Sequence, residues 1–208
     1  MLVGHLSVGL IGKRVDPKIS LGTWMLAALL ADFVCFPLLI ARVEGFHNSV
    51  GDIPYSHSLL MNTIWAALFA AAYFARRRYP RGAWLLFGAV LSHWVLDVIS
   101  HRPDMRLAPG VTSAFGLGLW NSLPATLIVE GGLWALAIFV YLRATHRTNG
   151  AGVYGFWIGI ALFTLSWYGN IQRGIDPDPV RAGVGGLIFF SLMVAWGYWM
   201  NRARLSNS

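Results

Sequence analysis

The stretch AWLLFGAVLSHWVLDVIS, residues 83–100, gives the strongest indication of the fold. It contains no lysine or arginine, and as a helix it is long enough to cross most of the hydrocarbon core of a bilayer. Its only ionisable side chains are those of His93 and Asp97. Ionisable groups inside a membrane span are costly, so each of the two is by default a functional hypothesis.

Similar apolar blocks on both sides of this stretch predict an all-α, polytopic transmembrane helix bundle. The six predicted spans are 21–41, 58–75, 83–100, 122–142, 153–171 and 183–201. Only 12% of the chain is charged, about half the share of a typical soluble domain. Residues 1–12 are apolar but too short to span, and they predict a retained N-terminal half-helix. We expect one transmembrane domain over 1–208. Its metal-site helices are predicted in 1–142 and two scaffold helices in 153–201.

The net charge of +7 is distributed as a topology signal. If the six spans alternate, one side of the membrane receives Lys13, Arg14, Lys18, Arg76, Arg77, Arg78, Arg81, Arg143, Arg147, Arg202 and Arg204. The other side receives only Arg42, Arg102, Arg106, Arg173 and Arg181. Basic loops face the cytoplasm, so both termini of the six-span bundle are predicted to be cytoplasmic, in a bacterial inner membrane. No soluble domain presents a basic face, and we expect no nucleic-acid partner.

The ionisable residues of the predicted spans converge on one depth. Counted from the basic helix ends, Asp32, His93 and Glu130 lie roughly 17, 18 and 20 Å along their helices. The residues at or just beyond this level are His57, Asp97, His101 and Asp104. His5 lies somewhat deeper, roughly 12 Å from Lys13. The convergence favours a shared site in the outer half of the membrane.

The spacing of His93, Asp97 and His101, four residues and four again, places them on one helix face. Asp104 follows three residues later and continues that face, or lies in a turn made by Pro103. Imidazole and carboxylate ligands suit zinc, and less specifically manganese or iron.

Other interpretations of the same residues stay open. Asp32 could pair with Arg42, and Glu130 could be a hydrogen-bond partner of Asn121 or of a tryptophan. A proton- or ion-coupled transporter uses the same residue types within its spans. A structural or accessory membrane protein could hold a metal for stability alone.

Several separated motifs carry a family resemblance. They are LSHWVLD at 91–97, with its Ser-His-x-x-x-Asp pattern, His5, Asp32, YSHS at 55–58, HRPD at 101–104, GLGLWNS at 116–122 and Glu130. In this order they resemble the predicted inner-membrane metal-dependent hydrolases, a family also described as LexA-binding and membrane-associated. The resemblance covers roughly residues 1–142.

Two segments differ from the family pattern. The first span carries ADFV at 31–34, where many members carry Pro-Asp-x-Asp. The segment PYSHS at 54–58 shortens the usual His-Arg-x-x-Thr-His-Ser. Two of the family's potential ligands are therefore absent, and His101, Asp104 and Glu130 are hypothesised to compensate.

The resemblance implies a metal-dependent hydrolase, and the depth of the polar residues predicts that its site opens to the extracytoplasmic leaflet. The expected ligands of the divalent metal, zinc first and manganese or iron next, are His5, Asp32, His57, His93 and Asp97. The expected catalytic acid, base or additional ligands are His101, Asp104 and Glu130. The expected substrate-binding residues are Arg102, Arg106 and Asn121. Membrane lipids, a lipid-like or phosphate-containing substrate and a second copy of the chain are the expected partners.

Overall fold

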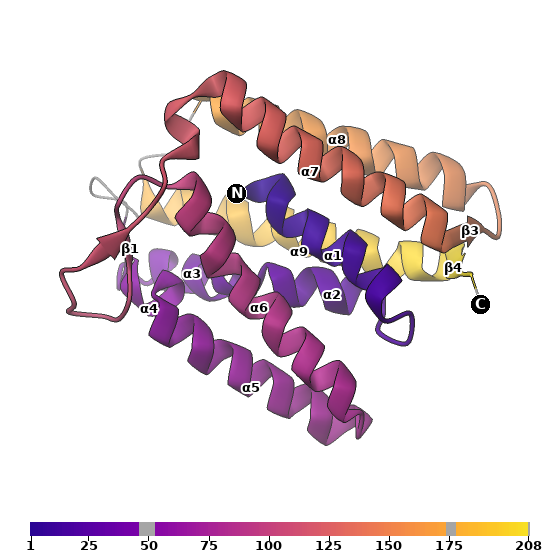
Figure 1. Ribbon diagram of the computed structural model, residues 1–208, viewed down its shortest axis with the longest axis horizontal. Helices are drawn as coiled ribbons and strands as arrows, with labels where there is room; N and C mark the ends of the chain where they lie inside the picture. The colour runs from indigo at the N-terminus through magenta and orange to yellow at the C-terminus, as the bar shows by residue number, and fades with distance from the viewer. Residues whose placement is uncertain (46–52, 174–177, 208) are drawn as a thin grey trace.

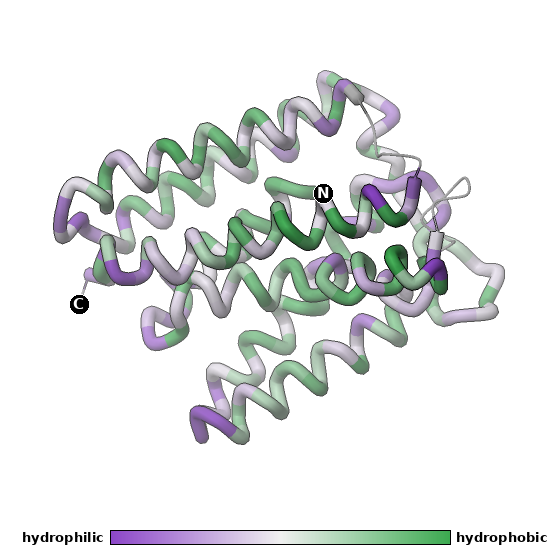
Figure 2. The backbone as a smooth tube through the Cα atoms, turned by 180° about the vertical axis from the view of Figure 1, so that it is seen from behind, coloured by the Kyte–Doolittle hydropathy of each residue, from purple (hydrophilic) through white to green (hydrophobic). Residues whose placement is uncertain are grey.

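The computed structural model describes residues 1–45, 53–173 and 178–207 and confirms an all-α bundle (Figure 1). Its α-helices are α1 (Leu2–Val15), α2 (Leu21–Ala28), α3 (Leu30–Ile40), α4 (Pro54–His57), α5 (Leu59–Arg77), α6 (Pro80–Ser100), α7 (Leu123–Ala144), α8 (Ala151–Arg173) and α9 (Pro179–Ala203). Within the described part of the chain, α5 to α9 are each long and apolar enough to cross a membrane. Figure 2 shows the apolar residues along the helices and hydrophilic ones at many of their ends.

The first predicted span, 21–41, is not one straight helix. It is broken at Leu29 into α2 and α3, whose axes differ by 56°. The break leaves the carbonyl of Ala28 at a helix end, where it accepts a hydrogen bond from Nδ1 of His93 at 2.9 Å. It also places Asp32 in the first turn of α3, where the helix dipole favours a carboxylate.

His57 directly precedes the second predicted span and belongs to a separate helix. It ends the one-turn helix α4, and α5 begins two residues later at Leu59. The side chain of Ser58 caps α5 by accepting a hydrogen bond from the amide of Met61 at 3.4 Å. His57 is therefore oriented by α4 rather than by a long membrane helix.

The predicted N-terminal half-helix is α1, which extends to Val15 and lies in the middle of the bundle (Figure 1). It packs against α7 on one side and against α2 and α6 on the other. Gly9 and Gly12 allow the close approach to α2, because a Cβ at either position would meet Met25 or Trp24 within 3 Å. The core around α1 is built from large buried side chains such as Leu6 and Leu10.

The two ends of the bundle differ in character. At the basic end α5 ends in Arg76 and Arg77, α7 ends near Arg143, and α9 ends near Arg202. At this end the short strands β3 (Thr145–Arg147) and β4 (Arg204–Ser206) pair antiparallel. Which end faces the cytoplasm stays a prediction from the charges.

At the distal end α6 finishes and α7 begins. The connection between them carries the antiparallel strands β1 (Met105–Arg106) and β2 (Ala114–Phe115), followed by the 3-10 turn η2 (Leu119–Asn121). This connection stands beside the end of α6, and it brings residues of η2 to the site described below.

Candidate metal centre

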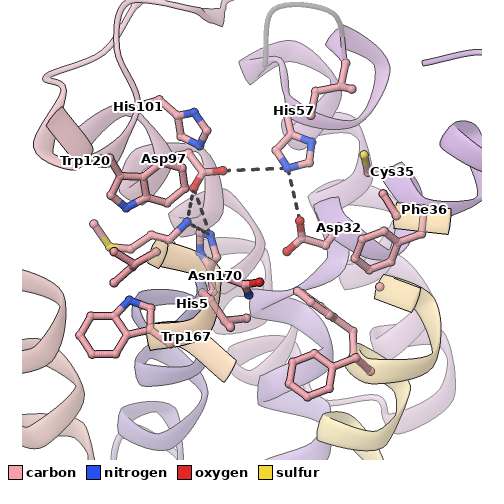
Figure 3. Close-up of a pocket in the computed structure, with 18 of the residues that line it drawn as sticks. His5, Asp32, Cys35, Phe36, His57, Asp97, His101, Trp120, Trp167 and Asn170 are labelled. Atoms are coloured by element: carbon pink, nitrogen blue, oxygen red, sulfur yellow. Dashed lines mark hydrogen bonds and ion pairs between the residues drawn. The ribbon is translucent and has the colours of Figure 1, made fainter. Parts of the chain in front are cut away.

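Five side chains from four helices meet near the distal end of the bundle (Figure 3). They are the five predicted metal ligands: His5 from α1, Asp32 from α3, His57 from α4, and His93 and Asp97 from α6. Two triplets among them, His5–Asp32–His93 and His57–His93–Asp97, have ligand atoms that all lie within 4.8 Å of one another. We call these five residues the His/Asp cluster.

The Nε2 atoms of the three histidines face the two carboxylates. Nε2 of His93 lies 3.2 Å from Oδ2 of Asp97 and 3.8 Å from Oδ2 of Asp32. Nε2 of His57 lies 3.5 Å from Oδ1 of Asp32 and 4.0 Å from Oδ2 of Asp97. Nε2 of His5 lies 3.1 Å from Oδ1 of Asp97. The same carboxylate oxygen lies 3.0 Å from the α-amino group of Met1.

The cluster is enclosed by protein. His5, His93 and Asp97 are almost fully buried, whereas the side chain of Asp32 is 20% exposed. The rings of His5 and His93 stack at 3.7 Å between centroids, and the ring of His57 stands edge-on to His93 at 5.1 Å. Asp32 is therefore the member of the cluster most open to an incoming molecule.

The hydrogen bonds of His93 assign its protons. A backbone carbonyl only accepts, so Nδ1 of His93 must be the protonated nitrogen that donates to Ala28. In the neutral ring, Nε2 then carries a lone pair, and this buried atom has no hydrogen-bond partner in the part of the chain that the structure describes. A lone pair that faces two carboxylates is repelled unless a proton or a metal ion lies between them.

His57 is oriented by a relay that the sequence analysis missed. Its Nδ1 lies 2.8 Å from Oγ of Ser56, and that hydroxyl donates to Oε2 of Glu44 at 2.7 Å. Since the single hydroxyl proton is directed to Glu44, Nδ1 of His57 is the donor and Nε2 is free to face the carboxylates. Glu44 is buried and also accepts from the amides of Tyr55 and Ser56, at 2.6 and 3.0 Å. The sequence signal for Glu44 was a carboxylate shortly before the His57 motif.

These observations fit a divalent metal. Three imidazole nitrogens and two carboxylates converge. Two of the imidazoles also donate a hydrogen bond through Nδ1, His93 to a backbone carbonyl and His57 to a hydroxyl. Such outer hydrogen bonds fix the tautomer and orientation of metal-binding histidines in proteins. The nitrogen and oxygen ligand set suits zinc, manganese or iron.

The predicted catalytic residues lie around the cluster at different distances. His101 follows the end of α6, lines the same cavity and packs against Trp120 at 4.4 Å between ring centroids. Burial lowers the pKa of His101 to about 4, so its ring is neutral at pH 7. Asp104 lies behind it, with Oδ1 3.7 Å from Nδ1 of His101.

Glu130 is fully buried in α7 and does not appear in the cavity wall. Its Oε1 accepts a hydrogen bond from Nε1 of Trp120 at 2.5 Å. Of the interpretations left open by the sequence, this geometry matches the tryptophan partner. Glu130 thus supports a residue of the cavity wall from behind.

The three predicted substrate-binding residues do not all lie at the cavity. Asn121 lines the cavity, whereas Arg102 and Arg106 do not. The Arg102 side chain is 69% exposed, and Nη1 of Arg106 donates to the carbonyl of Val111 at 2.9 Å. Among the described side chains, the arginine that does line the cavity is Arg181, at the start of α9.

The cavity beside the cluster has a volume of about 1010 Å³. Figure 3 shows Trp120, Trp167 and Asn170 on the side away from His57, with Cys35 and Phe36 on the other. Because Trp167 and Asn170 belong to α8, the helices predicted to be scaffold also form part of the site.

The comparisons with known proteins agree with a membrane location. No curated protein and no solved structure gives a significant match. A family model described as YdjM inner membrane protein matches residues 1–174, which include every helix that contributes to the His/Asp cluster. The chain therefore belongs to the YdjM inner membrane protein family and is an integral membrane protein.

Proposed function

We propose that the His/Asp cluster binds a divalent metal, and that the protein is a membrane-embedded, metal-dependent hydrolase of a lipid or lipid-linked phosphoester. The observation that carries the proposal is the convergence of three histidine Nε2 atoms on two carboxylates beside a large cavity. The basic residues at the opposite end of the bundle support an extracytoplasmic location for this site.

A divalent metal in such a site supplies a Lewis acid for the phosphoryl group and a nucleophile near neutral pH. The protein's own groups complete the chemistry around it. Asp32, the most exposed carboxylate of the cluster, is placed to accept a proton from an attacking water. The proton accepted by Asp32 can then pass to the leaving oxygen. His101 lines the cavity with a neutral ring that can accept a hydrogen bond from the substrate or a water molecule. Asn121 offers an amide donor to a phosphoryl oxygen.

A proton-coupled transporter is the second candidate, and the core of α1 argues against it. Such a protein needs polar groups that continue across the membrane. Between the cluster and Lys13, α1 presents the fully buried Leu6 and Leu10 to the core. The hydroxyl of Ser7 donates to the carbonyl of Val3 at 2.6 Å, within the same helix.

Metal content tests the proposal. Wild-type protein, purified without a metal-affinity column, is expected to contain near-stoichiometric zinc, manganese or iron by mass spectrometry. The double variant His93→Ala/Asp97→Ala is expected to lose it. His146→Ala is the control, because His146 is exposed at the basic end and its Nδ1 contacts Asn207.

Turnover is then measured on phosphoester lipids with the metal that the wild type retains. Hydrolysis by the wild type and by His146→Ala, but not by the double variant, is the expected result. A wild type that takes up none of the three metals after resupply would overturn the proposal and lead to pH-dependent transport assays in vesicles.

A further inference from the structure

The cavity beside the His/Asp cluster extends along α8 and α9. Its wall there is formed by Ile171, Gln172, Arg181, Gly185, Phe189 and Phe190. The side chains near the helix ends, Gln172 and Arg181, are polar, and those farther along α9, Phe189 and Phe190, are aromatic. The cavity therefore changes from polar at its rim to apolar inside the bundle.

Among the described residues, the close contacts between α8 and α9 lie in the halves of the two helices that are nearer the basic end of the bundle. Nε1 of Trp196 donates to the carbonyl of Gly155 at 2.9 Å, and the ring of Trp196 lies 5.1 Å from that of Phe163. A Cβ at Gly159 would also collide with Trp196. Toward the distal end α8 and α9 splay apart (Figure 2), and the cavity takes residues from both. We call this part of the cavity the α8–α9 groove.

Gly185 leaves the groove open. A Cβ at this position would meet no atom within 4 Å. Two neighbouring glycines behave differently, because a Cβ at Gly183 or Gly186 would meet the backbone or ring of Phe36 at 2.8 or 2.3 Å. Gly183 and Gly186 thus allow α9 to pack on α3, whereas Gly185 contributes only to the width of the groove.

The surroundings of the groove are those of a membrane helix facing lipid. Val184 and Ile188 on α9 and Leu165 on α8 are exposed apolar side chains. Arg181 adds a positive charge at the rim, and the cluster, once it holds a metal, adds positive charge at the inner end. A molecule with an anionic head group and an apolar chain matches these positive charges and the apolar wall of the groove.

We propose that the α8–α9 groove admits an anionic phospholipid from the surrounding bilayer, with an acyl chain along Phe189 and Phe190 and its phosphate directed toward the His/Asp cluster. Arg181 attracts the phosphate at the rim of the groove. The inference deepens the proposed hydrolase, and it rests on that proposal for the fate of the bound lipid, although binding itself needs no turnover.

Photo-crosslinking in vesicles tests the groove directly. The protein as purified is reconstituted in phosphatidylcholine with a phosphonate analogue of phosphatidic acid, which resists hydrolysis and carries a diazirine on one acyl chain. After illumination, labelled peptides are located by mass spectrometry. We expect labelling to concentrate on the distal parts of α8 and α9, and diacylglycerol with the same diazirine to label these peptides weakly. Labelling that is spread evenly over the lipid-exposed faces of the helices would overturn the proposal.

Two variants and one control sharpen the test. Gly185→Leu should reduce groove labelling about tenfold, because the new side chain displaces roughly two methylene groups of the lipid chain. Arg181→Gln should reduce the preference for phosphatidic acid over diacylglycerol about fivefold, as expected for one partly exposed charge. Gly88→Leu is the control, because Gly88 is exposed on α6 and its Cβ position is also open.

The outcomes separate the two proposals. Groove labelling that Gly185→Leu abolishes supports lipid entry even if no metal is found, and then only the hydrolase fails. Metal binding with groove labelling that neither variant changes leaves the hydrolase intact and overturns lipid entry by this route. Size-exclusion profiles show whether Gly185→Leu folds, and Arg181→Gln gives an independent readout if it does not.

Discussion

The two ends of the bundle both bury charged groups, but they satisfy them in different ways. At the basic end, Nζ of Lys13 donates to the carbonyls of Pro17 and Ile19 at 2.7 and 3.2 Å. The Arg204 guanidinium donates to Thr145 and to the carbonyl of Gly152. Each of these cations is paired with fixed oxygen acceptors, which is the usual condition of a buried structural charge.

The His/Asp cluster is the opposite case. Among the described residues, Nε2 of His93 and Nδ1 of His5 are buried without a hydrogen-bond partner, and in the neutral ring of His93 the Nε2 lone pair lies 3.2 Å from a carboxylate oxygen of Asp97. Buried groups that repel one another lower stability unless something else compensates. The difference teaches that the basic end satisfies its buried charges with fixed protein acceptors, whereas the cluster leaves buried ring nitrogens that a bound cation would satisfy.

The largest effect on stability is expected at the basic end. Arg204→Met removes three charge-assisted hydrogen bonds, so the free energy of unfolding should fall by about 3 kcal/mol. Thermal unfolding in detergent measures the change, and metal content should not move. Arg202→Met is the control, because Arg202 is exposed on the same helix end. An equal loss of stability in the two variants would contradict the structural role of Arg204.

An intermediate effect is expected from the relay that orients His57. Glu44→Gln keeps the size of the side chain but removes the charge that accepts the Ser56 hydroxyl. Metal affinity should fall about tenfold, since outer hydrogen bonds to a ligand typically contribute this much. Competition with a chelating dye measures the affinity. Asp16→Asn is the control, because Asp16 follows α1 at the basic end of the bundle, where its Oδ2 accepts a hydrogen bond from Tyr79. An unchanged metal affinity in Glu44→Gln would contradict a role of Glu44 in orienting His57 for metal binding.

The smallest effect is a gain in stability. Asp32→Asn replaces a carboxylate by an amide that can donate to Nε2 of His57 or His93. The metal-free protein should become more stable by about 1 kcal/mol, because repulsion is replaced by a hydrogen bond. Metal should no longer raise the unfolding temperature. Chelated samples of both proteins are compared by thermal unfolding, and a less stable metal-free variant would contradict the repulsion described for the cluster.

The sequence located the helices because apolar blocks of bilayer length report where the chain crosses. Five of the six predicted spans correspond to single helices within a few residues of the predicted ends. The exception, the break at Leu29, has no proline or glycine beside it in the sequence. What the break achieves, a free Ala28 carbonyl for His93, depends on a helix more than sixty residues away.

The sequence also brought four of the five candidate ligands to about one depth, with His5 somewhat deeper, because the helical rise converts residue number into height. Height alone leaves the rotation of each helix and its neighbours undetermined. That is why Glu130, at the predicted level, lies behind Trp120, and why Arg181 rather than Arg102 lines the cavity.

Sequence by itself therefore determined the class of fold, the approximate spans and the residues that meet in the cluster. Only the tertiary structure decided which nitrogen of each oriented histidine faces the carboxylates, that Glu44 supports His57, and that α8 and α9 open a groove. These features depend on contacts between segments far apart in the chain, and the pattern along one helix does not specify what packs against it.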